Sequence, residues 1–227
     1  MKPIKPVTIT IDWPAGSGKW TTARRLAEKL GYKYFDSGAF YRALWVFLHE
    51  KWVDVEHIQE SDLENIELDF SSDDRVMVNG LDYETKIRNI EASTYASLVA
   101  AQKFSRQLVI SAGRKIIESG NFVVEGRDMG TVWFPSAQVK IYLTADATVR
   151  AHRRWMELQA KWEDVTEEEV LKKICERDDR DMTRADGPLR KPEWAYEIDT
   201  THLTIDEQVE RIYEIVQEVL QKEDNLS

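Results

Sequence analysis

The chain has 227 residues, 42% of them hydrophobic and 32% charged, which is typical of a globular protein with one core and room for a small inserted lobe. Its 41 acidic and 31 basic side chains give a net charge of −10, which argues against general binding to nucleic acid or to an anionic membrane. Since Cys175 is the only cysteine and no apolar run approaches the length of a membrane span, we expect a cytoplasmic protein without disulfides.

The first half of the chain alternates strands and helices and then breaks the alternation. The patterns predict a strand at 7–11, a helix at 21–30 that closes at Gly31, a strand at 33–35 and a helix at 39–50. Residues 54–74 are acidic and weakly patterned. Residues 75–78 then meet Asn79-Gly80, a strong tight-turn signal, so we expect a small hairpin lobe here.

The second half resumes the alternation. A long helix is predicted at 94–119, strands at 122–124 and 139–143, helices at 147–161 and 166–184, a strand at 196–198 and a last helix at 205–222. Cys175 falls in the apolar pattern of the 166–184 helix, so we expect it to be buried. Strands that alternate with helices predict an α/β fold whose parallel sheet is covered on both faces.

A glycine-rich loop at residues 12–21 follows the first strand and opens the first helix. The backbone N–H groups of Gly16, Ser17, Gly18 and Lys19 can wrap phosphates in this context, and the Lys19 ammonium adds a positive charge. The alternative is a turn that only joins strand to helix. The placement after a strand favours a phosphate loop that binds ATP.

Two tryptophans depart from this pattern. Trp13 stands where a glycine allows close backbone approach, and Trp20 stands where a serine or threonine hydroxyl binds Mg²⁺. Thr21 lies about 100° further round the helix and is no simple replacement. Trp52 and Trp162 also occupy helix ends that favour glycine. The pattern indicates an altered or inactivated sequence, and Trp13→Gly with Trp20→Ser is expected to raise phosphoryl transfer.

Three further segments are rich in ligand-binding side chains, and each has a purely structural alternative. Residues 36–42 follow the second strand, where Ser37 could be only a helix cap and Arg42 only a solvated charge. Residues 125–131 form a glycine-flanked turn whose Arg127-Asp128 could be a surface ion pair. Residues 177–184 place Arg177, Asp181 and Arg184 on one helix face, which could be merely solvated.

Together these segments resemble the bacterial cytidylate kinase family over nearly the whole chain, from the first strand to residues 198–201. Residues 130–135, 143–145 and 151–154 and the Asn79-Gly80 hairpin extend the similarity. The resemblance implies an α/β, P-loop NTPase-type three-layer fold with a central parallel sheet. It implies a single kinase domain over residues 1–227, with a core at about 1–53 and 120–227, an inserted acceptor-binding lobe at about 54–119 and a helical lid at about 153–190.

The resemblance also implies ATP-dependent phosphorylation of CMP and dCMP to the diphosphate in pyrimidine nucleotide metabolism, by a monomer with Mg²⁺ as cofactor. The CMP-binding set would be Ser37, Tyr41, Arg42, Ser97, Arg106, Arg127, Asp128, Arg177, Asp181 and Arg184. Of these, Ser97, Arg106 and Asp128 would contact cytosine, Arg177 and Asp181 the ribose, and the three other arginines the acceptor phosphate. From the sequence pattern alone, without the resemblance to the family, Ser97 and Arg106 would be interpreted as part of a polar helix surface.

The ATP-binding set implied by the resemblance comprises Gly16, Ser17, Gly18, Lys19, Trp20, Thr21 and Arg154. The catalytic set would be Lys19, Arg127, Arg153 and Arg184, and Asp36 would hold the metal through a water. Two alternatives stay open. One is a kinase for UMP, AMP or shikimate, and the other is an inactive protein that keeps the CMP site.

Overall fold

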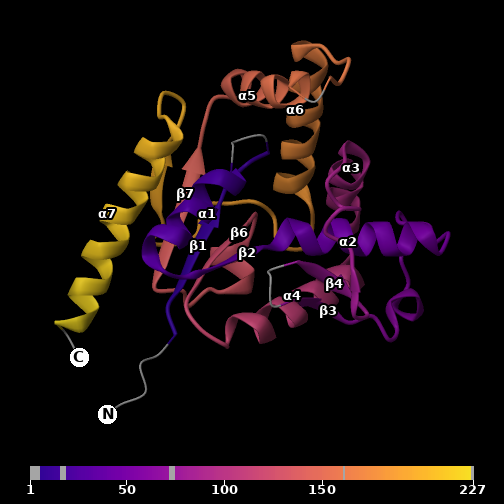
Figure 1. Cartoon of the computed structure of the whole chain (residues 1–227), viewed down its shortest axis with the longest axis horizontal. Helices are drawn as coiled ribbons and strands as arrows, with labels where there is room; N and C mark the ends of the chain where they lie inside the picture. The colour runs from indigo at the N-terminus through magenta and orange to yellow at the C-terminus, as the bar shows by residue number, and fades with distance from the viewer. Residues whose placement is uncertain (1–5, 16–18, 72–74, 161, 226–227) are drawn as a thin grey trace. The chain divides into compact units, whose positions relative to one another are not determined.

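A computed structural model of the chain describes residues 6–15, 19–71, 75–160 and 162–225 (Figure 1). It divides into two compact units. The first unit comprises Met1–Phe35 and Gly120–Ser227, and the second comprises Asp36–Ser119. The predicted lobe of residues 54–119 lies within the second unit, which also contains helix α2 (Ser37–Glu50).

A five-stranded sheet with the order β2-β6-β1-β7-β8 forms the centre of the first unit. Its strands are β1 (Thr8–Asp12), β2 (Lys33–Asp36), β6 (Phe122–Gly126), β7 (Val139–Thr144) and β8 (Tyr196–Asp199). Strand β1 pairs in parallel with β6 and β7, which places Asp12 beside Gly126 and Tyr142. Ile9, Ile11 and Val123 are buried on one face and Thr10 and Val124 on the other, as in a covered parallel sheet. The predicted α/β fold is confirmed.

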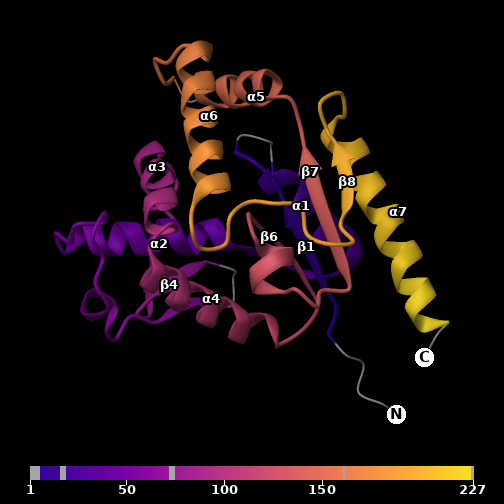
Figure 2. The ribbon, with the colours of Figure 1, turned by 180° about the vertical axis from the view of Figure 1, so that it is seen from behind.

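Four helices accompany this sheet: α1 (Lys19–Leu30), α5 (Ala147–Gln159), α6 (Glu167–Thr183) and α7 (Ile205–Asp224). Helices α1 and α7 lie side by side against the sheet, as both views show (Figures 1 and 2). Their apolar faces, which include Leu26, Ile212 and Val216, join the core of the sheet. Helix α5 follows β7 and packs along α6.

The second unit joins helices to a small antiparallel sheet of order β3-β4-β5. Its elements after α2 are a 3₁₀ turn η1 (Glu60–Leu63), β3 (Leu68–Phe70), β4 (Val76–Val78), β5 (Leu81–Asp82), α3 (Ile90–Val99) and α4 (Lys103–Ile117). Asn79 and Gly80 connect β4 to β5 with φ of 50° and 75°, the left-handed pair of a type I′ turn. The predicted hairpin is confirmed.

The long helix predicted at 94–119 is wrong, because the chain breaks into α3 and α4. Gln102 at the break has an extended backbone, with φ −81° and ψ 128°. Its side-chain amide donates a hydrogen bond to the carbonyl of Glu56 (2.9 Å). The break lets α3 pack on α2 and α4 pack on β3 and η1, so tertiary packing overrides a continuous helical pattern.

The predicted burial of Cys175 is also wrong, since the thiol is exposed. Helix α6 buries Val170, Ile174, Asp178 and Asp181, which recur at helical spacing, and Cys175 lies one residue off that stripe. Two of the buried positions are therefore carboxylates. Within the part of the chain that the structure describes, no helix combines the length and apolar character needed to span a membrane.

Candidate active site

The candidate site lies where β1 and β6 end. Strand β1 occupies the centre of the sheet, and the chain passes from β6 on one side of β1 to β7 on the other. Open α/β sheets bind ligands at such a reversal, outside the carboxyl ends of the strands. Gly16, Ser17 and Gly18 lie outside the described residues, and Lys19 and Trp20 are described only as the start of α1. Their predicted contacts with ATP stay predictions.

The described entry to the phosphate loop is fixed by a buried ion pair. The Ala15 N–H donates to the carboxylate of Asp178 on α6 (2.7 Å), and the Ala15 carbonyl accepts from Arg150 on α5 (2.6 Å). Arg150 also donates to Asp178 (2.6 Å). The pair thus ties two helices to the loop. Sequence reasoning missed both residues, although Asp178 continues the buried spacing of Val170 and Ile174.

Asp12 connects the end of β1 to the turn after β6. Its two carboxylate oxygens accept hydrogen bonds from the backbone N–H groups of Met129 (2.7 Å) and Gly130 (2.8 Å). Burial raises the pKa of Asp12 to about 7, and nearby Asp128 adds to the rise, while the two N–H donors and the Arg127 charge oppose it. A side chain at Gly130 would lie 2.7 Å from Pro192 and 3.0 Å from Thr10, which explains the glycine.

Five charged residues meet at this edge and form what we call the arginine–aspartate cluster: Arg127, Asp128, Arg177, Asp181 and Arg184. Arg127 donates to Asp181 at 2.8 Å, Arg177 lies 3.8 Å from the same carboxylate, and Arg184 lies 3.2 Å from Asp128. The structure therefore brings together all the residues that were predicted from segments 125–131 and 177–184. The surface-ion-pair and solvated-helix alternatives are wrong for Arg127, Asp128, Asp181 and Arg184, whose side chains are at most 11% exposed.

The cluster is arranged to receive an anion. Burial alone would raise the pKa of Asp181, but the charges of Arg127, Arg177 and Arg184 and the hydrogen bond from Arg127 outweigh it and hold that pKa below its usual value. Asp181 is therefore a fixed negative charge beside three guanidinium groups. The Nη2 atom of Arg127 is buried without a hydrogen-bond partner. A donor left open in this way suits a phosphate oxygen.

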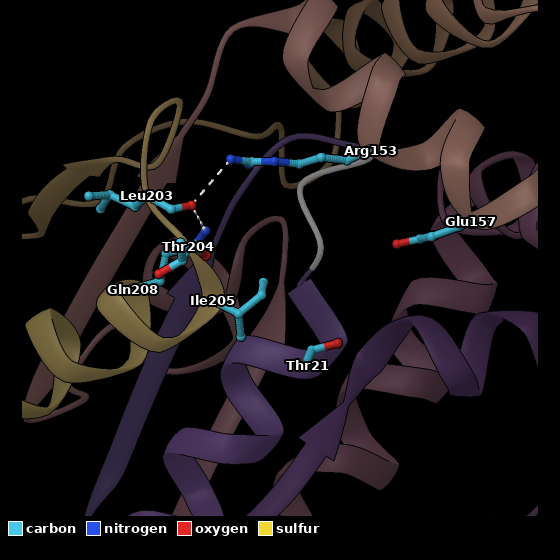
Figure 3. Close-up of a pocket in the computed structure, with 7 residues that line it drawn as sticks. All are labelled: Thr21, Arg153, Glu157, Leu203, Thr204, Ile205 and Gln208. Atoms are coloured by element: carbon cyan, nitrogen blue, oxygen red, sulfur yellow. Dashed lines mark hydrogen bonds between the residues drawn. The ribbon is translucent and has the colours of Figure 1, made fainter.

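A hollow of about 270 Å³ lies beside the first turn of α1 (Figure 3). It is lined by Thr21, Arg153, Glu157, Leu203, Thr204, Ile205 and Gln208. Arg153 extends from α5 toward the loop before α7 and donates to the carbonyl of Leu203 (3.4 Å), while Glu157 points into the hollow (Figure 3). Arg153 also donates to the carbonyls of Thr200 (2.8 Å) and Thr201 (3.2 Å). The volume is close to the lower end of ligand pockets, which are roughly 300–1,000 Å³.

Arg153, predicted to be catalytic, and Arg154, predicted to bind ATP, differ in their surroundings. Burial lowers the pKa of Arg153 from its usual value, and its Nη1 atom is buried without a hydrogen-bond partner. Arg154 instead forms an ion pair with Glu157 on the helix surface (2.8 Å). Of the two, only Arg153 lines the hollow, so Arg153 is the better placed to meet a ligand there.

The second unit carries the remaining predicted residues. Asp36 caps α2 by accepting from the Ala39 N–H (3.1 Å), and Arg42 donates to its other oxygen (2.7 Å). Burial tends to raise the pKa of Asp36, but the charge and hydrogen bond of Arg42 outweigh burial and lower it. The cap belongs to Asp36 and not to Ser37, which is buried. Since both Asp36 oxygens already accept hydrogen bonds, its metal-bound water stays a prediction.

Two of the three residues predicted to contact the base, Ser97 and Arg106, are buried within the same unit. Ser97 near the end of α3 and Arg106 near the start of α4 are 3% and 4% exposed, so their interpretation as a polar helix surface is wrong. The Ser97 hydroxyl donates to the Thr94 carbonyl (3.0 Å), and Tyr41 on α2 is also buried. A buried guanidinium such as that of Arg106 is uncommon without a specific role.

The described residues contain no group of three or more His, Cys, Asp or Glu side chains that could hold a metal ion. Mg²⁺ that enters with a nucleotide is usually bound mainly by phosphate oxygens and water, so it does not need such a group of protein side chains.

The comparisons with known proteins agree with this geometry. The family model described as Cytidylate kinase matches residues 9–218. A protein named cytidylate kinase from Thermotoga sp. (strain RQ2) is 43% identical over 213 residues, 92% of this chain and 96% of that protein. Another so named, from Thermosipho africanus (strain TCF52B), is 44% identical over 213 residues, 94% and 96% of the two chains.

A solved structure of an uncharacterized protein from Eubacterium ventriosum is 14% identical and covers 94% of this chain and 99% of its own, with a TM-score of 0.52. At this identity the likeness concerns the fold alone. The family model and the curated relatives, in contrast, cover almost the whole sequence. On this evidence the chain belongs to the cytidylate kinase family.

Proposed function

We propose that the protein transfers the γ-phosphoryl group of ATP to CMP and dCMP, which yields ADP and the pyrimidine nucleoside diphosphate. The observation that carries the proposal is the arginine–aspartate cluster. Three guanidinium groups surround a buried carboxylate at the ligand-binding edge of the sheet, and Arg127 keeps an open donor there. The match to the cytidylate kinase family over residues 9–218 supplies the substrate class.

The chemistry asks mainly for alignment and charge neutralisation. The acceptor phosphate is already a competent nucleophile, so the protein needs no dedicated general base. Arg127 and Arg184 hold and neutralise the acceptor phosphate, and Asp181 with Arg177 binds the ribose hydroxyls. Asp181 also orients Arg127 through their 2.8 Å hydrogen bond, so that the guanidinium is in place before the nucleotide arrives.

On the donor side, the backbone of the phosphate loop and Lys19 bind the ATP phosphates, and the hollow beside α1 receives the adenosine. Leu203 and Ile205 give that hollow apolar walls, and Arg153 gives it a cation. Mg²⁺ would be held by the ATP phosphates and, through a water, by Asp36, and it would supply charge neutralisation on the transferring phosphoryl group. Residues 153–190 act as a lid that excludes water and so limits ATP hydrolysis.

Base selectivity is assigned to Ser97, Arg106 and Asp128. A carboxylate accepts from the amino group of cytosine, and donors on Ser97 and Arg106 satisfy its ring nitrogen and carbonyl. UMP carries a carbonyl in place of that amino group and would present an acceptor to the Asp128 carboxylate, which is costly in a buried site. This argument disfavours UMP, and the family match does not favour any of the rival acceptors UMP, AMP and shikimate.

The test is steady-state ADP production with CMP, dCMP, UMP, AMP and shikimate as acceptors, beside calorimetric titration of CMP. Turnover with CMP and dCMP, at least tenfold above the other acceptors, is the expected result. Turnover with another acceptor in preference to CMP contradicts the assignment of the base-reading residues. CMP binding without turnover would instead identify an inactive protein that retains the acceptor site.

A further inference from the structure

The eight tryptophans of the chain fall into two groups. Three of them use their rings or their indole N–H. Trp45 stacks on Tyr95 with ring centroids 5.3 Å apart, the Trp133 ring meets Phe35 edge-on at 5.9 Å, and Trp155 donates its indole N–H to the Val165 carbonyl (3.1 Å). The others, at positions 13, 20, 52, 162 and 194, lie in or beside the phosphate loop, at helix ends or in a turn.

The end of α2 shows this at Trp52. The Val53 N–H donates to the Leu48 carbonyl and the Trp52 N–H to the His49 carbonyl, a pair of bonds that closes the helix with one residue in the left-handed region. That residue is Trp52, with φ of 61°. Glycine is the usual residue at such a position because a Cβ atom is strained there.

Helix α1 provides an internal comparison, since it ends with the same pair of bonds. The Tyr32 N–H donates to Ala27 and the Gly31 N–H to Glu28, and the left-handed residue is Gly31, with φ of 69°. Helix α5 ends alike at Trp162, whose φ is 60°. Two helices thus end with tryptophan in a backbone motif that a third helix ends with glycine.

Trp194 completes the pattern in the turn before β8, with φ of 61°. Among the described residues, the only side-chain-bearing types with left-handed φ are tryptophan at these three positions and asparagine at 65 and 79. Asparagine tolerates this region, whereas a bulky residue there is an outlier. The three tryptophans are also 91–95% exposed, so their rings gain almost nothing from packing.

The phosphate loop holds the other two. Trp13 stands at its first glycine position, where the ring is fully buried and its indole N–H has no hydrogen-bond partner. A buried donor without a partner is unfavourable. Trp20 follows Lys19 just as Trp52 follows Lys51 and Trp162 follows Lys161. Phosphate loops need small residues where the backbone approaches the ligand.

We infer that the cell inserts glycine at positions 13, 20, 52, 162 and 194. One cause accounts for all five positions. The gene carries a codon there that one genetic code translates as tryptophan and the cell's own code translates as glycine. UGA has this property, because different codes read it as termination, tryptophan or glycine. The three tryptophans that use their rings are then encoded by UGG. Glycine then stands at both ends of the phosphate loop, and neither indole obstructs it, although glycine at position 20 supplies no hydroxyl for Mg²⁺.

The direct test is peptide mass spectrometry of the protein purified from its own cells, beside the sequence of its gene. Peptides that span the five positions are expected at the glycine mass, and peptides that span Trp45, Trp133 and Trp155 at the tryptophan mass. The gene is expected to carry UGA at the first set and UGG at the second. Tryptophan masses at positions 52, 162 and 194, or UGG codons throughout, overturn the inference. Neither readout depends on kinase activity.

A recombinant comparison adds a functional readout. One chain carries glycine at all five positions, and its control carries glycine only at 52, 162 and 194. The first is expected to phosphorylate CMP at least tenfold faster than the control, because only it removes both indole side chains from the phosphate loop. Equal turnover of the two chains would overturn the assignment of glycine at positions 13 and 20.

Discussion

The arginine–aspartate cluster and the phosphate loop adjoin the same edge of the sheet, yet they are specified in different ways. The cluster is built from charged side chains that are paired across loops and helices, such as Arg184 with Asp128. The described start of the loop is held through backbone groups of Ala15. Ligand binding by the cluster therefore depends on the charges of its side chains. Ligand binding by the backbone of the loop depends instead on small residues and on the ion pair that anchors the loop.

The loop anchor can be broken at Asp178. Its replacement by alanine leaves Arg150 buried without its ionic partner, so we expect the free energy of unfolding to fall by about 3–5 kcal/mol. Denaturant titration measures this loss. Asp179→Ala, which alters the exposed neighbour, is the control and is expected within about 0.5 kcal/mol of the parent. Equal stability of the two variants would show that the ion pair does not anchor the loop.

The cluster can be broken at Arg127. Arg127→Met removes the open donor and the partner of Asp181, and we expect kcat for CMP phosphorylation to fall by about 10²–10³-fold. Steady-state kinetics measure the loss, with the exposed Arg190→Met as control. A fall confined to the affinity for ATP would place Arg127 on the donor side and contradict its role toward the acceptor phosphate.

Asp12 links the two regions and predicts a dependence on pH. Its pKa of about 7 in the folded protein lies above the usual 3.8, so the folded state binds more protons than the unfolded state between these values. The free energy of unfolding is therefore expected to fall, by roughly 2–4 kcal/mol, as the pH rises from 4 to 7. Asp12→Asn should remove this slope in denaturant titrations. An unchanged slope would assign the effect to another group.

The smallest expected effect concerns size at a helix end rather than charge. Trp52→Gly should raise the free energy of unfolding by about 1 kcal/mol, because it relieves a side chain in the left-handed region. Gly31→Trp at the matching position of α1 should lower it by about 1–2 kcal/mol. Thermal unfolding measures both changes. Shifts of the same sign would contradict the equivalence of the two helix ends.

Much of this arrangement could be predicted from the sequence. The parallel sheet and the hairpin turn follow from periodicity and turn residues, whereas the cluster was expected from the resemblance to the cytidylate kinase family. The break at Gln102 could not, since it depends on a contact with Glu56 that is distant in sequence. Burial of Asp178 and exposure of Cys175 depend on which stripe of α6 faces the protein. The left-handed backbone at Trp194 could not be predicted either, because residue propensities do not show that this turn needs a glycine-like conformation.

The central claim is that the acceptor side is intact in the tryptophan-bearing chain and that the donor side is limited by Trp13 and Trp20. Calorimetric CMP affinity and CMP-dependent ADP production, measured on that chain and on its Trp13→Gly, Trp20→Gly variant, test this claim most directly. We predict equal CMP affinity and turnover at least tenfold higher in the variant. Equal turnover, or a large change in CMP affinity, would contradict the claim.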